Sequence, residues 1–121
     1  MSLLLLTLLA CGEPGDDSGG ADGGADTADA ACQDAPVVTW ASWGQGFLIE
    51  SCQGCHASTS PDRNDAPQTV VFDTEADVIA HRDRILARAT GEAPDMPPRG
   101  GVSEDDRALL EIWLRCWLEA E

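Results

Sequence analysis

Two thiols and an imidazole stand within five consecutive residues, in the order Cys52-Gln53-Gly54-Cys55-His56. The spacing CxxCH is typical of segments that attach a c-type haem. Two thiols three positions apart on a helical turn can reach the two vinyl groups on one side of a porphyrin, and the next residue then places an imidazole under the iron. We therefore expect Cys52 and Cys55 to bind one haem c covalently and His56 to be an axial ligand of its iron.

Two other kinds of chemistry use closely spaced cysteines. A redox-active disulfide is typical of CxxC motifs that follow a strand in an α/β pattern, and the sequence shows no such pattern. A structural zinc site needs four protein ligands, but the remaining cysteines are far apart and the only other histidine is His81. These residues favour haem attachment over both alternatives.

A six-coordinate haem needs a second axial ligand, for which Met96 is the first choice. It is the only methionine besides Met1, and it lies in Asp95-Met96-Pro97-Pro98-Arg99-Gly100-Gly101, a loop too rich in Pro and Gly to be a helix. Prolines stiffen such a loop, so the sulfur can be held on the iron without a large loss of entropy. A lone Met is often core filler, and His81, at the edge of an apolar helix stripe, is the alternative ligand.

Three helices are expected to position these residues. They run from about Trp40 into the CxxCH motif, from Glu75 to Ala89 and from Glu104 to Glu119, with Thr39, Thr74 and Ser103 as N-caps. Apolar residues at helical spacing predict the buried faces: Trp40, Trp43, Phe47 and Leu48; Val78, Ile79, Ile85, Leu86 and Ala89; and Ala108, Leu109, Ile112, Trp113, Cys116 and Trp117. Arg82 lies along the second stripe, where it is either a snorkelling surface residue or a partner for a haem propionate.

With these motifs the chain resembles the class I cytochromes c, especially bacterial lipoprotein cytochromes with an MPP…WL–C pattern, over residues 32–121. The resemblance implies a small all-α fold around one haem, a monomer, and electron exchange with other redox proteins. It also implies that the first and last helices cross at Gly44 and that the carbonyl of Pro67 accepts the N–H of His56. No acid–base or nucleophilic constellation is visible, so we do not expect an enzyme.

Two other functions remain open from the sequence. A haem enzyme or gas sensor would keep the sixth coordination position open, which requires Met96 to be absent from the iron. A structural or interaction lipoprotein with an incidental haem is the other.

The beginning of the chain has the pattern of an exported, anchored protein. Residues 1–10 form an apolar run too short to span a membrane and of the length of an export signal. Leu8-Leu9-Ala10-Cys11-Gly12 resembles a bacterial lipobox, which implies lipidation of Cys11; an ordinary signal peptide with an incidental cysteine is the other interpretation. Residues 11–31 are predicted to be a disordered acidic linker, so the domain is expected to face the periplasm or cell exterior from a bacterial membrane.

Charge excludes one class of partner. The chain has 22 Asp and Glu against 7 Lys and Arg, a formal net charge of −15, and every base is Arg. Nucleic-acid binding needs a basic surface, so we expect no nucleic-acid partner. Any electrostatic steering favours a basic face on a redox partner.

Two cysteines remain once Cys11, Cys52 and Cys55 have their predicted roles. Cys32 lies just before the first helix and Cys116 lies on the last helix, which is expected to pack against the first. In an exported, oxidising context such a pair usually bonds. We therefore predict a Cys32–Cys116 disulfide, the alternative being that Cys116 is a buried apolar thiol.

Overall fold

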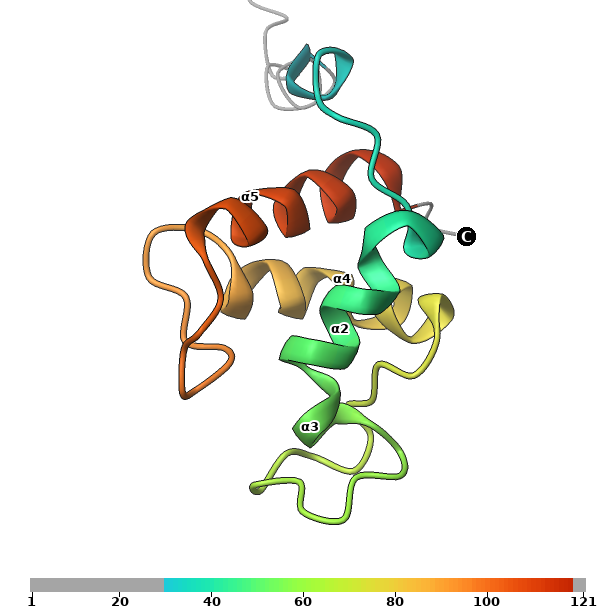
Figure 1. Ribbon diagram of the computed structural model, residues 1–121, viewed down its shortest axis with the longest axis vertical. Helices are drawn as coiled ribbons and strands as arrows, with labels where there is room; N and C mark the ends of the chain where they lie inside the picture. Colours follow the sequence, from blue (N-terminus) through green and yellow to red (C-terminus); the bar gives the residue numbers. More distant parts are fainter. Residues whose placement is uncertain (1–29, 119–121) are drawn as a thin grey trace, which may run out of the picture.

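The computed structural model describes residues 30–118, and within this range the chain forms helices joined by loops, with no strand. The expected all-α class is therefore confirmed. In the view of Figure 1, the loop 57–73 lies below the short helix α3. Helix α5 lies above helix α4 in the same view.

The first helical segment consists of three parts. A π-helical turn, η1 (Trp40–Gly44), leads into α2 (Gln45–Ser51), and α3 (Gln53–His56) follows after a break at Cys52. Thr39 is the N-cap, as predicted, and its hydroxyl accepts a hydrogen bond from the backbone N–H of Ser42. The serine hydroxyl in turn accepts from the backbone N–H of Thr39, which completes a capping box.

Helix α4 spans Glu75–Ala89, the bounds expected from the sequence. Thr74 and Asp77 form the capping box at its start, where two acidic residues of the first turn also complement the helix dipole. Gly91, with φ +85°, follows its end, in the left-handed conformation that glycine adopts readily.

The last helix consists of α5 (Glu104–Ile112) and a π-helical end, η2 (Trp113–Trp117), and Ser103 caps its start as predicted. Its buried face differs from the expected one. Leu110, Trp113, Leu114 and Leu118 are buried, whereas Ala108 is exposed and Leu109 and Ile112 are only partly buried. Residues 109–118 are apolar almost all round, so the 3.6-residue period fits two overlapping arcs and only packing against the other helices selects one.

The first and last helices meet at Gly44, as the resemblance implied. A Cβ atom at this position would lie 2.6 Å from atom Cη2 of the Trp113 indole, which is fully buried. The ring of Trp113 also packs near those of Trp40 and Trp43, at centroid distances of 6.3 and 6.4 Å. The core around this crossing comprises Val38, Phe47, Leu48, Phe72, Val78, Ile85, Ala89, Leu110, Trp113, Leu114 and Leu118.

A disulfide joins the segment before η1 to the end of the last helix. Cys32 and Cys116 are bonded, with their Cα atoms 5.4 Å apart, so the predicted pairing is confirmed by the geometry. The indole N–H of Trp117 donates to the carbonyl of Pro36 over 2.8 Å and holds the same two segments together. A helical turn covers residues 30–33, so the predicted boundary between linker and domain, at Cys32, falls inside it.

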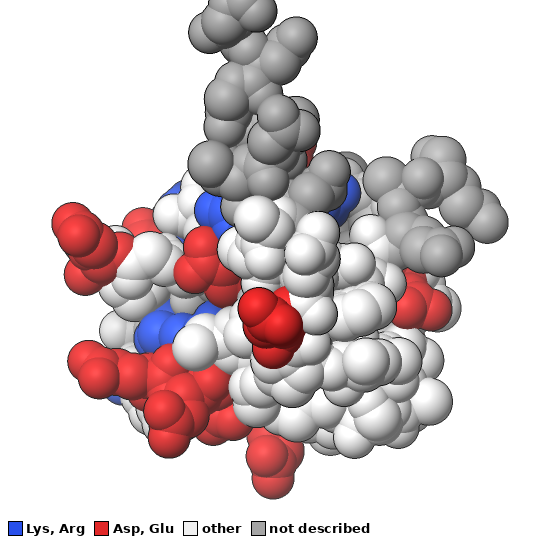
Figure 2. Space-filling view, turned by 90° about the horizontal axis from the view of Figure 1, so that it is seen from above, with Lys and Arg blue, Asp and Glu red and all other residues white. Residues whose placement is uncertain are grey.

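Acidic side chains gather on one side of the face shown in Figure 2, with a few arginines between them, while much of the remaining face is uncharged. None of the helices in the described part of the chain has both the length and the apolar character needed to span a bilayer. Cys11 and most of the predicted linker lie outside the described residues.

Candidate functional site

The CxxCH segment occupies a bend between two helices. Cys52 ends α2, with φ −125° and ψ −40°, and its carbonyl accepts hydrogen bonds from the backbone N–H groups of Cys55 and His56, over 3.2 and 2.9 Å. The two thiols are therefore carried on one short turn, and the imidazole of His56 follows directly. This is the local geometry that the spacing predicted.

A backbone carbonyl fixes the orientation of the His56 ring through a hydrogen bond to one ring nitrogen. Its Nδ1 atom lies 2.9 Å from the carbonyl oxygen of Val70, and since a carbonyl can only accept, Nδ1 carries the proton and donates. In the neutral imidazole with this tautomer, the Nε2 atom keeps its lone pair, which is the form in which imidazole binds a metal. The ring of Phe72 packs against the same imidazole, with centroids 4.9 Å apart.

The prediction that Pro67 supplies this carbonyl is wrong. The Pro67 oxygen instead accepts from the backbone N–H of Val70, over 3.0 Å, and from Nη2 of Arg63, over 2.8 Å. The chain turns once more after the proline, so the carbonyl that reaches His56 comes three residues later.

Backbone and side-chain hydrogen bonds hold the loop 57–73 onto the CxxCH segment. The N–H of Phe72 donates to the carbonyl of His56, over 2.7 Å, and Nε2 of Gln53 donates to the carbonyl of Phe72, over 2.9 Å. Where the two ends of the loop meet, the backbone N–H of Ser58 also donates to the carboxylate of Asp73. Hydrogen bonds from Ser58, with a smaller contribution from the charge of Arg63, lower the pKa of Asp73.

The two thiols of the motif are not bonded to each other. Burial raises the pKa of Cys52 to about 12, against a smaller opposing effect of the Arg107 charge. The Nδ2 amide of Asn64 lies 3.3 Å from Sγ of Cys55. Within residues 30–118 no three His, Cys, Asp or Glu side chains gather in a way that could hold a metal ion among themselves.

The loop that carries Met96 is held by two arginines, which sequence reasoning did not single out. The backbone carbonyl of Arg88 accepts from the N–H groups of both Asp95 and Met96, each over 2.9 Å, and the guanidinium of Arg88 forms an ion pair with the Asp95 carboxylate. From α5, Nη1 of Arg107 donates to the carbonyls of Met96 and Ala89, over 2.8 and 2.7 Å. The charge of Arg107 also acts on Cys52, so Arg107 lies near the CxxCH segment as well as the Met96 loop.

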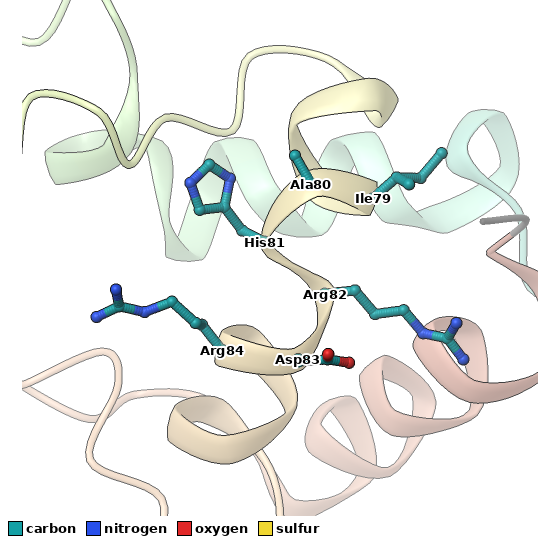
Figure 3. A pocket seen from close by; sticks show the side chains of 6 residues that line it. All are labelled: Ile79, Ala80, His81, Arg82, Asp83 and Arg84. Carbon is teal, nitrogen blue, oxygen red and sulfur yellow. The ribbon is translucent and has the colours of Figure 1, made fainter. Parts of the chain in front are cut away.

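The side chains of His81 and Arg82 leave α4 in different directions (Figure 3). Nδ1 of His81 donates to the carbonyl of Asp77 one turn back, over 2.9 Å, and its ring meets Phe72 edge-on at 5.7 Å. The guanidinium of Arg82 instead donates to the carbonyl of Arg115, over 3.3 Å. The structure thus places Arg82 against η2, a helix end that carries none of the predicted haem ligands.

Comparison with known proteins found no matching protein family, curated protein or solved structure.

Proposed function

We propose that residues 32–121 are a monohaem c-type cytochrome domain that carries single electrons between redox proteins. Cys52 and Cys55 hold the haem through thioethers, and His56 and Met96 are the axial ligands. The domain acts as a monomer, has no enzymatic activity, and is tethered through Cys11 to a bacterial membrane, facing the periplasm or the cell exterior. The bound haem supplies the one-electron chemistry, and the chain supplies ligation, orientation and burial.

The observation that carries the proposal is the fixed orientation of His56. Its Nδ1–H is engaged by the Val70 carbonyl, over 2.9 Å, which leaves Nε2 as the donor atom. Ligating histidines almost always donate their other ring N–H in this way. The two thiols stand on the same turn as this imidazole.

The chemistry of the thiols supports a thioether over a redox-active disulfide. A redox nucleophile must be a thiolate. Burial raises the pKa of Cys52 to about 12, which disfavours the thiolate at neutral pH. A thioether sulfur carries no charge and suits the same environment.

The Met96 loop supports thioether ligation because its backbone is already fixed. Both the N–H and the carbonyl of Met96 are hydrogen-bonded, to Arg88 and Arg107 respectively. A loop that is ordered in advance loses little entropy when its sulfur binds. Met96 also packs against the same hydrophobic core as Cys52.

Covalent attachment is tested by producing the chain together with a c-type haem maturation system and measuring its intact mass. We expect one haem to stay bound after denaturation in the natural sequence, and none in the Cys52→Ala/Cys55→Ala double variant. The matched control is Cys32→Ala/Cys116→Ala, which also removes two cysteines but should keep the haem. A natural sequence without covalent haem, or a haem retained in the first double variant, would exclude this function.

The sixth ligand is tested by carbon monoxide binding and by the weak ferric absorption band of methionine ligation near the red end of the spectrum. We expect the band to be present and carbon monoxide to bind slowly or not at all, whereas Met96→Ala should lose the band and bind carbon monoxide at once. His81→Ala should behave as the natural sequence does. Immediate carbon monoxide binding by the natural sequence would favour a haem enzyme or gas sensor with an open position.

A further inference from the structure

The side chain of Arg63 binds several backbone carbonyls of the loop 57–73, which contacts His56. Its guanidinium donates to backbone carbonyls of the loop: Nη1 to Ala57 over 2.6 Å, Nη2 to Pro67 over 2.8 Å and to Val70 over 3.1 Å. Within the described residues no carboxylate lies at ion-pair distance from it. A positive charge is thus held among carbonyl oxygens of the segment that contacts the imidazole.

One of these carbonyls is shared with His56. The oxygen of Val70 accepts from Nη2 of Arg63, over 3.1 Å, and from Nδ1 of His56, over 2.9 Å. A carbonyl oxygen has two lone pairs and can accept both hydrogen bonds at once. The guanidinium of Arg63 and the imidazole of His56 are therefore linked through one atom, the carbonyl oxygen of Val70.

We propose that Arg63 is a positioning residue that raises the reduction potential of the centre ligated by His56, an inference that rests on the proposed haem function. A hydrogen bond from a guanidinium draws electron density from the Val70 oxygen, which then pulls less on the Nδ1 proton. The imidazole becomes a poorer electron donor through Nε2, because the partner of the other ring nitrogen sets ligand basicity. A poorer donor stabilises ferric iron less than a stronger donor does, so the reduction potential of the iron rises.

The charge of Arg63 acts in the same direction. Ferric iron carries one more positive charge than ferrous iron, so a fixed cation near the ligand opposes oxidation. The partly buried loop screens this effect less than bulk water does. Both contributions favour the reduced state.

The test is optical redox titration of haem-loaded variants, beside an NMR measurement of the His56 Nδ1–H resonance. Arg63→Gln removes the charge and leaves a neutral amide donor, and Arg63→Lys keeps the charge without the planar fork. The matched control is Arg84→Gln, because Arg84 is an exposed residue of α4. We expect the midpoint potential to fall in Arg63→Gln by more than in the control, with Arg63→Lys between Arg63→Gln and the natural sequence. The Nδ1–H resonance should shift in both Arg63 variants and stay in place in the control.

The outcomes separate this inference from the proposed function. Arg63 variants that keep the methionine absorption band, but whose potential and resonance change no more than in Arg84→Gln, would overturn the role of Arg63 alone. A rise in potential in Arg63→Gln would also overturn it. Absence of covalent haem in the natural sequence would instead overturn the function itself. If Arg63→Gln does not fold, a potential of Arg63→Lys equal to that of the natural sequence is the contradicting result.

Discussion

Replacing Gly44 by alanine tests the helix crossing that supports the whole domain. The new Cβ would lie 2.6, 2.7 and 2.9 Å from three atoms of the Trp113 indole, where ordinary contact distances between carbon atoms are about 3.5–4.0 Å. Trp113 is fully buried, so the ring cannot turn out into solvent. Overpacking of this kind costs about 1–3 kcal/mol, and because the obstacle is a rigid ring we expect about 2–3 kcal/mol.

Helix propensity works in the opposite direction and is measured by a matched control. Alanine in a helix interior is favoured over glycine by about 1 kcal/mol. At Gly46, two residues later in α2, an added methyl group would meet no other atom within 4 Å, so Gly46→Ala should be more stable by about that amount. Gly44→Ala should lose about 1–2 kcal/mol in net terms.

Urea unfolding followed by circular dichroism measures the two free energies. The variants should differ by about 2–3 kcal/mol, or roughly 10–20 °C in Tm for a domain of this size. Equal stabilities of Gly44→Ala and Gly46→Ala would refute the close crossing of the first and last helices.

Three further predictions concern the disulfide, acid stability and the anchor. Removing the Cys32–Cys116 disulfide, which spans 84 residues, should lower the free energy of unfolding by about 4.5 kcal/mol in the chain-entropy model. Urea unfolding of Cys32→Ala/Cys116→Ala measures this loss, and an unchanged midpoint would contradict it. The lowered pKa of Asp73 contributes stability above the pKa of the unfolded carboxyl, about 4, which is lost as pH falls through the folded pKa. Asp73→Asn should therefore be less stable at pH 7, and its Tm should vary less between about pH 5 and 2; parallel curves would show that the Ser58 contact contributes nothing. Cys11→Ser should release the protein from the membrane fraction or block its maturation, whereas a natural sequence found wholly in the soluble fraction would remove the anchor.

Local signals in the sequence predicted the helices and the CxxCH turn. Thr39, Thr74 and Ser103 were identifiable as N-caps because a cap depends only on residues within one turn. The pairing of Cys32 with Cys116 followed from the roles assigned to the other cysteines and from the expected packing of the end helices. These inferences needed no knowledge of loop geometry.

Long-range packing determined what the sequence could not predict. Which carbonyl reaches His56 depends on how Arg63 folds the loop 57–73, and nothing local distinguishes Val70 from Pro67 in that role. The buried arc of the last helix contains Leu110 and Leu114 in place of Leu109 and Ile112. Packing against the other helices selects this arc, and periodicity alone does not. Arg107 stands among charged residues near the start of α5 and gave no signal that it would hold the Met96 carbonyl.

The central claim, a single electron-carrying haem ligated by His56 and Met96, is tested most directly by an optical redox titration of the natural protein. We predict one reversible one-electron transition, with the red-end band of methionine ligation present in the ferric state and absent from Met96→Ala. A protein that shows no haem transition, or whose ferric form lacks this band and binds carbon monoxide immediately on reduction, would contradict the claim.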